Sequence, residues 1–329
     1  MNDLKPKTIK ELMNHISKDS GININESDEK HLLHMGYYHG YKGCRHLHKK
    51  NVVLALKDFS ELYSIYQFDL NIKSLFYRYI MFIETAYKNI VLDIVTGEAN
   101  SAVFGEIFNL VLNDYKRFQK NTKEYKTSVL ERNKLRDSIY KVVSDAYQNN
   151  NPIAIHYQNK DSVIPIWGIF EMISLGTFGK FIKASNRSVR GKISRSFGIG
   201  PNYDTSFEIP HRIIFALKDL RNAIAHNNII FDTRFCNVNI DHSLKSLILG
   251  ETGIIVDFKN IFDYVVLMAV VLKKLEYDNG DLQRLVDKFY SYTEKLRTAL
   301  INNISIFNTI FPTNLRNSVN SLRLYIGKK

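Results

Sequence analysis

Cysteine and proline are scarce in this sequence. Its 329 residues include two cysteines, Cys44 and Cys236, and six prolines. Two cysteines cannot build a disulfide framework and form no CxxC pair, so we expect reduced thiols in a reducing compartment. We predict a mostly helical protein, because prolines are few, glycines number sixteen, and long stretches have a 3.6-residue hydrophobic period.

Long apolar runs are also missing. The longest one, residues 264–272, is about half of the ~20 residues that a membrane span needs. The first 21 residues contain no apolar segment of the kind found in secretory signals. We therefore expect a cytoplasmic protein without a membrane partner.

Negative charge is in deficit. Lys and Arg number 45 against 33 Asp and Glu, which gives a net charge of +12. A surplus of this size favours an anionic partner such as nucleic acid. Residues 180–195 carry six basic residues and no acidic one, which we interpret either as a solvated face or as a phosphate-binding strip. The six are Lys180, Lys183, Arg187, Arg190, Lys192 and Arg195.

An aromatic and basic segment lies at residues 31–50. It contains five histidines and Cys44, but no matching set of carboxylates or thiolates, so we predict no metal and no cofactor. Its mixture of His, Tyr, Lys and Arg suits RNA better. We expect His39, Lys42 and Arg45 to contact RNA. Glycines at 36, 40 and 43 make a long unbroken helix unfavourable here.

The rest of the chain predicts helices over most of its length. We expect them at 3–18, 51–95, 101–148, 166–185 with a bend at Gly176 and Gly179, 208–226, 259–276 and 280–303. Residues 229–235 and 253–258 have some strand character.

The most informative helix covers residues 213–226. At 100° per residue, its apolar side chains fall within about 60° of one another. Asn222 and His226 lie on the opposite face, and Arg221 lies on the flank. The common interpretation of such a pattern is an ordinary helix end, with His226 near the dipole and Asn227 as a stop.

Four ordered blocks support a second interpretation. They are GYYHGYKG at 36–43, IYQFDLNIKSLFYRYIMFIETAYKNIV at 65–91, IPIWGIFEMISLGTFGKF at 164–181 and LRNAIAHNN at 220–228. Together they resemble the Abi-like (AbiD/AbiF-type) abortive-infection proteins, and RNAIAH resembles the R-N-x-x-x-H motif of HEPN ribonucleases. The likeness covers roughly residues 30–235.

This resemblance implies an all-α fold, a HEPN-like helical bundle with additional N- and C-terminal helices. We divide the chain into an N-terminal helix and polar segment (1–30), an Abi-like HEPN domain (31–240) and a C-terminal helical extension (241–329) on the same core. Several further family positions are expected to be structural. Trp167 should anchor the core, Tyr66 and Asp69 should make helix-start or inter-helix hydrogen bonds, and Glu84 or Glu171 should pair near the motif.

The resemblance also implies a metal-independent endoribonuclease. His226 would move protons, and Arg221 would hold the phosphate. Asn222 would orient His226 or the scissile phosphate. One motif per chain implies a homodimer with a composite site that acts on RNA and not on DNA. An AbiF-type likeness implies restraint by a small noncoding RNA. Two alternatives stay open, namely a non-catalytic RNA-binding scaffold and a protein-interaction module.

Overall fold

The computed structural model describes residues 7–236 and 240–328. The described chain is almost entirely helical, which confirms the all-α prediction. It divides into two compact units. The first combines Met1–Tyr79, Asp219–Asn239 and Ile248–Lys329, and the second combines Ile80–Lys218 and Ile240–Leu247.

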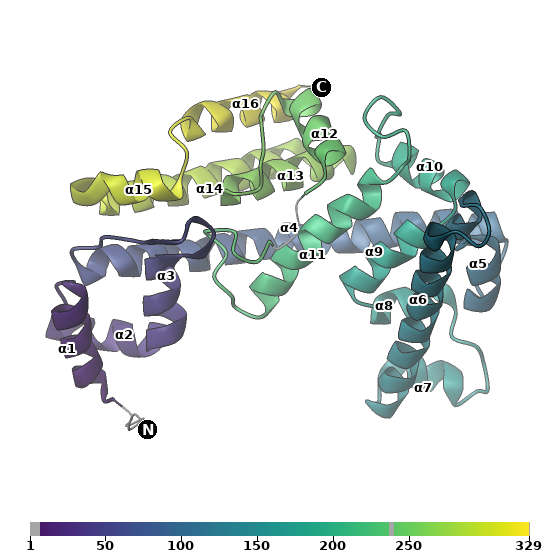
Figure 1. Ribbon diagram of the computed structural model, residues 1–329, viewed down its shortest axis with the longest axis horizontal. Helices are drawn as coiled ribbons and strands as arrows, with labels where there is room; N and C mark the ends of the chain where they lie inside the picture. Colours follow the sequence, from purple (N-terminus) through teal and green to yellow (C-terminus); the bar gives the residue numbers. More distant parts are fainter. Residues whose placement is uncertain (1–6, 237–239, 329) are drawn as a thin grey trace. The chain divides into compact units, whose positions relative to one another are not determined.

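The first unit starts with short elements (Figure 1). These are α1 (Ile9–Ser20), α2 (Glu29–Met35), the π-helix η2 (Gly36–Lys42), α3 (Gly43–Arg45) and the antiparallel strands β1 (His46–Leu47) and β2 (Val52–Val53). Thr8 is the N-cap residue of α1, and its side chain forms a capping box with Glu11. Residues 3–6 of the expected N-terminal helix lie outside the described part of the chain.

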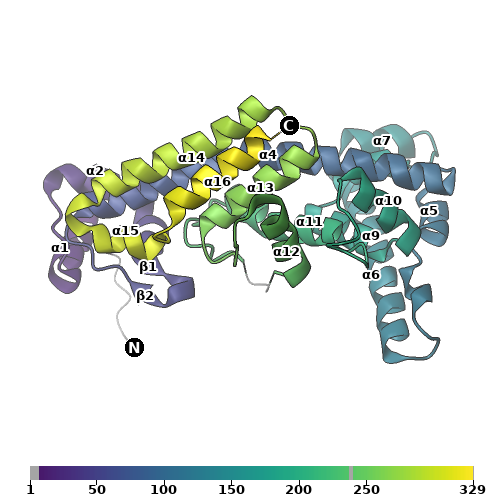
Figure 2. The ribbon, with the colours of Figure 1, turned by 90° about the horizontal axis from the view of Figure 1, so that it is seen from above.

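The core of the first unit is built around one apolar helix. The unit contains the start of α4 (Phe59–Ala99) together with α13 (Ile261–Lys274), α14 (Asn279–Ala299), α15 (Ile304–Ile310) and α16 (Leu315–Gly327). Every residue of α13 from Ile261 to Leu272 is buried. The longest apolar run of the sequence is therefore a core helix, with α14 and α16 packed alongside (Figure 2).

The second unit holds the rest of α4 and a set of shorter helices. These are α5 (Phe104–Leu110), the 3₁₀-helix η4 (Asp114–Arg117), α6 (Lys123–Gln148), α7 (Pro152–Gln158), α8 (Ile166–Met172), α9 (Leu175–Ala184), α10 (Arg187–Ser196) and most of α11 (Ile209–Ala225). Helix α12 (His242–Thr252) is shared by the two units. Helix α6 contacts α7, α8 and α9.

Two local predictions were wrong. The bend expected at Gly176 and Gly179 lies earlier, between α8 and α9, because Ser174 caps a new helix that contains both glycines. The strand character of residues 229–235 and 253–258 produces no strand there, because neither segment has a partner strand within the described residues. The short hairpin at 46–53 was not predicted.

Candidate functional site

Helix α11 presents the RNAIAH segment at its C-terminal end. Leu217 and Leu220 are buried, while Asn222 and His226 are exposed and Arg221 is half-buried. The hydrophobic period predicts this distribution, because residues four apart share a helix face. The face that carries Asn222 and His226 therefore points away from the core and is accessible to a ligand.

The helix stops in a defined turn directly after the motif. Asn227 adopts the left-handed conformation with φ = 53°. Its N–H donates to the carbonyl of Ile224 at 3.0 Å, and the N–H of Asn228 donates to the carbonyl of Ala223 at 2.7 Å. This pair of bonds is the Schellman motif, and Asn is one of the few residues that tolerates its left-handed position. His226 is thus fixed at the backbone by a closed helix end.

A buried ion pair holds this turn to α4. Asp69 is fully buried and forms an ion pair with Lys73 at 2.6 Å. Lys73 donates to the side-chain oxygen of Asn227 at 3.0 Å and to its carbonyl at 3.3 Å. The other carboxylate oxygen of Asp69 accepts the N–H groups of Ile230 and Phe231 at 2.8 and 2.9 Å. These bonds fix the backbone on the C-terminal side of the motif.

The interactions of Asp69 differ from those predicted for it. We expected a bond at a helix start or between helices, whereas Asp69 binds the backbone of the loop after α11. Burial raises the pKa of Asp69, against the opposing effects of Lys73 and the two N–H groups. Lys73 was missed in the sequence, although an Asp and a Lys four residues apart in an apolar helix were a usable signal.

The aromatic block reaches the same part of the first unit. Gly43 lies close to the loop after α11, and a Cβ there would come within 3.1 Å of Ile229. His39, in the π-helix, is half-buried. The pKa of His39 is lowered, mainly by burial and then by the positive charge of Lys73. The negative charge of Asp69 has the opposite effect. Three sequence blocks that are far apart in the chain therefore meet around the end of α11.

The other predicted RNA contacts in this block have different environments. Lys42 is exposed above the rings of Tyr37 and Tyr38. Arg45 is half-buried and donates to the hydroxyls of Ser20 and Tyr41, so its guanidinium stabilises the local fold. Lys42 is thus the more accessible of the two basic groups.

A row of aromatic rings crosses this surface. His31 stacks on Tyr63 with ring centres 4.2 Å apart, and Tyr66 lies 6.3 Å from Tyr63 and edge-on to His39. Tyr66 thus contributes a ring contact in addition to any hydrogen bond. Partly exposed aromatic rings are the usual platform for unpaired bases.

A second missed residue, Arg234, holds the loop after α11 to the aromatic block. Its guanidinium donates to the carbonyls of Gly43 and His46 at 2.6 and 2.7 Å. It also pairs with Asp232 at 2.8 Å. No sequence motif marked this Arg-Asp pair, because its carbonyl partners lie almost 190 residues away.

The basic segment 180–195 is not one exposed strip. Arg190 is buried and forms an ion pair with Asp114 at 2.8 Å, so it is not part of an exposed phosphate-binding strip. A buried guanidinium needs such a partner. Lys183 and Lys192 are exposed but pair with Glu131 and Glu98. Arg187 is exposed and donates to the carbonyl of Thr205. Lys180 and Arg195 are exposed.

The structural prediction for Trp167 needs correction. Trp167 is 48% exposed, so it does not anchor the core. On the short helix α8, Ile166, Ile169 and Phe170 take the inward face, and Trp167 shares the outward face with Glu171. Glu84 pairs with Lys88 at 3.0 Å, and Lys88 donates to the carbonyl of Ile173.

The described residues contain neither a metal-binding cluster nor a membrane-spanning helix. No group of three or more His, Cys, Asp and Glu side chains within residues 7–236 and 240–328 is arranged to hold a metal ion. In the same part of the chain, no helix combines the length and apolarity that crossing a membrane requires.

Comparison with known proteins identifies the family. Residues 30–232 match the family model described as Abi-like protein. The match covers more than half of the chain, which therefore belongs to the Abi-like family. Membership points to a role in abortive infection. Neither the curated proteins nor the solved structures gave a match.

Proposed function

We propose that this protein is a HEPN-type endoribonuclease of antiphage defence that needs no metal ion. The observation that carries the proposal is the end of α11. There an Arg-Asn-x-x-x-His segment leaves Asn222 and His226 exposed on a turn fixed by Asp69 and Lys73. A rigid, exposed His with a nearby Arg suits phosphate chemistry on a large substrate.

The reaction follows from the chemistry of RNA. The 2′-hydroxyl attacks the adjacent phosphorus and loses its proton, and the bond from phosphorus to the 5′-oxygen breaks. The products are a 2′,3′-cyclic phosphate and a 5′-hydroxyl, which gains a proton. His226 transfers protons near neutral pH, and Arg221 stabilises the charge that develops on the phosphate. Asn222, on the same helix face as His226, orients the imidazole or the phosphate. DNA lacks the 2′-hydroxyl and is not cleaved.

Regulation and assembly belong to the same proposal. One motif per chain, exposed at a helix end, suits a homodimer in which two copies of α11 form a composite site. The net charge of +12 and the aromatic row from His31 to His39 suit a noncoding RNA that restrains the enzyme in the cytoplasm of uninfected cells.

The test is a cleavage assay on RNA-free protein in EDTA. Wild-type protein should cut total RNA and leave 2′,3′-cyclic phosphate ends, and His226→Ala and Arg221→Ala should each lose at least about 100-fold in rate. His156→Ala changes an exposed histidine on α7, in the other unit, and should leave the rate unchanged.

RNA that co-purifies with each variant separates the alternatives. A discrete bound RNA without cleavage by any variant would favour a non-catalytic scaffold. Neither cleavage nor bound RNA, with a protein complex that is insensitive to salt, would favour an interaction module.

A further inference from the structure

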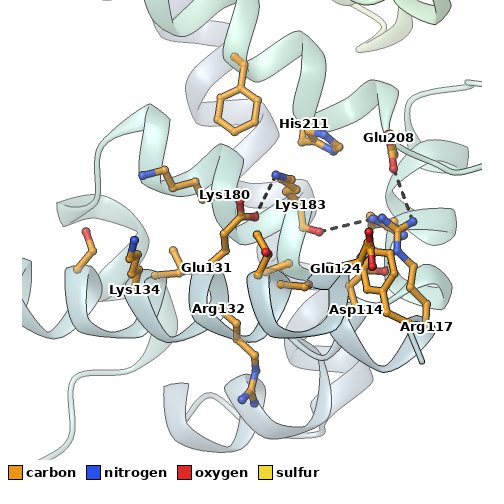
Figure 3. Close-up of a pocket in the computed structure, with 18 of the residues that line it drawn as sticks. Asp114, Arg117, Glu124, Glu131, Arg132, Lys134, Lys180, Lys183, Glu208 and His211 are labelled. Carbon is orange, nitrogen blue, oxygen red and sulfur yellow. Dashed lines mark hydrogen bonds and ion pairs between the residues drawn. The ribbon is translucent and has the colours of Figure 1, made fainter. Parts of the chain in front are cut away.

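The second unit contains a cavity that the proposed ribonuclease site does not use. Its volume is about 650 Å³, within the range of pockets that bind nucleotide-sized molecules. It lies between α6, η4, α9, α10 and the start of α11 (Figure 3). All of its lining residues belong to the second unit, whereas Arg221 and His226 belong to the first.

The lining is rich in positive charge. Seven Lys and Arg side chains and four Asp and Glu side chains border the cavity. Asp114 pairs with Arg117 and Arg190, and Glu131 pairs with Lys183. Arg132 points away from the cavity, and its guanidinium donates to the carbonyl of Phe108 (Figure 3).

Three exposed lysines remain available at the cavity, and one of them is Lys123 at the start of α6. Lys134 of α6 and Lys180 of α9 are exposed and have no acidic partner among the residues that the structure describes. Figure 3 shows both side chains on the side of α6 that faces the cavity. Two free ammonium groups at one opening form a site for a ligand with more than one negative charge.

The deep side of the cavity has buried polar atoms without a partner. His211 is 6% exposed, and its Nδ1 has no hydrogen-bond partner within the described chain. Arg190 is 1% exposed, and its Nε also has no hydrogen-bond partner within the described chain. Natural proteins pair nearly all buried polar atoms, so these two atoms beside one cavity are available to bind a polar group of a ligand or a water molecule.

The charge state of His211 fits this interpretation. Burial, and to a lesser extent four cationic side chains, lower its pKa to about 3. They are Arg212, Arg190, Lys183 and Arg117. The lowered pKa keeps this imidazole neutral, so it can hydrogen-bond a polar group, and the cationic side chains nearby favour a negatively charged ligand.

We propose that this cavity binds a phosphorylated molecule of nucleotide size. Lys134 and Lys180 bind its phosphates, and His211 and Arg190 hydrogen-bond its buried end. Phe118 and Phe215, which also line the cavity, provide apolar contacts for a base or sugar. The same phosphate chemistry is found in a free nucleotide and in a nucleotide of an RNA strand.

Calorimetry on the full, RNA-free chain tests the proposal. ATP, GTP and pyrophosphate are titrated in 150 mM KCl with EDTA, and adenosine is the uncharged control. We expect saturable binding of at least one phosphate compound and at least 10-fold weaker binding of adenosine. The double variant Lys134→Glu with Lys180→Glu should lower the affinity at least 10-fold.

A matched variant controls for net charge. Lys141→Glu with Lys160→Glu changes the charge by the same amount at exposed positions of the same unit that do not line the cavity. It should bind like the wild type. His211→Gln should also weaken binding. If His211→Gln fails to fold, as circular dichroism would show, the exposed lysine variants still decide the question.

A second arm identifies the source of the phosphate. An eight-nucleotide single-stranded RNA is titrated into the His226→Ala variant. It is also titrated into a triple variant that adds Lys134→Glu and Lys180→Glu to His226→Ala. If the triple variant loses RNA binding and calorimetry detects no binding of a free nucleotide, the site is supported with RNA as its ligand. Equal binding by all variants, or no binding of any probe, would overturn it. His226→Ala should bind ATP normally, so this test is independent of the proposed catalysis.

Discussion

The most consequential single residues of the first unit are the buried pair Asp69 and Lys73. Both side chains lie on α4, and they are 0% and 7% exposed. Between them they bind Asn227 and the N–H groups of two further residues in the loop after α11. A pair of this kind contributes less through its own attraction than through the unpaired charge that remains when one partner is removed.

Replacing one partner tests this role. Lys73→Met should lower the free energy of unfolding by about 3–5 kcal/mol, because it leaves the Asp69 carboxylate buried without its cation. Urea unfolding measures the loss. The matched control is Lys183→Met, which removes the lysine of an exposed pair and should cost less than about 1 kcal/mol. Equal losses for the two variants would contradict the structural role.

Asp263 gives a second prediction at this scale, which concerns pH. Burial raises its pKa to about 7, although Phe258 and Asp257 donate N–H groups to it. Below its ordinary pKa, Asp263 is protonated in both the folded and the unfolded chain. Between about pH 4 and 7 only the folded chain keeps the proton, so the stabilisation is lost as the pH rises through that window.

The variant Asp263→Asn removes this titration. The free energy of unfolding of the wild type, measured relative to the variant, should fall by up to about 1.4 kcal/mol per pH unit from pH 5 to 7. It should be constant above pH 8. Urea unfolding at pH 5, 6, 7 and 8 measures the difference, and a difference independent of pH would refute the assignment.

Among the elements, α9 and α11 illustrate what glycine does in this fold. Gly179 lies within α9, and a Cβ there would come within 2.9 Å of Phe215 and 3.1 Å of Ile214 on α11. The residue expected to bend a helix therefore lets two helices pack closely. Gly97, on α4, is different, because a Cβ there meets open space.

Alanine scanning of these two glycines separates packing from helix propensity. Gly179→Ala should lower the free energy of unfolding by about 1–3 kcal/mol, because the added methyl group overpacks the contact between the helices. Gly97→Ala should raise it by about 0.5–1 kcal/mol, since alanine is the better helix former. Thermal unfolding measures both. A stabilising Gly179→Ala would show that the contact can relax.

For the whole molecule, the positive charge sets the expected behaviour toward RNA. With 45 basic and 33 acidic residues, binding should release counterions, and the affinity should fall steeply between 50 and 300 mM KCl. Filter binding of a labelled RNA to His226→Ala measures the slope. An affinity that barely changes with salt would argue against phosphate contacts and for recognition of a protein partner.

The sequence predicted the helical class and the register of the motif helix well. Helices α11, α13 and α14 begin and end within a few residues of the predicted limits. Helices α11 and α14 have a clear apolar face, and α13 contains a continuous apolar run. Two C-terminal helices, α15 and α16, were missed, since short amphipathic segments carry a weak signal. The all-buried helix α13 was recognised as too short for a membrane span.

By itself, the sequence determined which residues are candidates for chemistry and which face of α11 they share, because a helical period fixes directions along one element. It also determined the charge surplus. Only the tertiary structure decided that Asp69, Lys73, Gly43 and Arg234 hold the end of that helix. It likewise decided that Arg190 is buried and that Trp167 is exposed. These outcomes depend on contacts between residues up to about 190 positions apart, and no local pattern encodes such contacts.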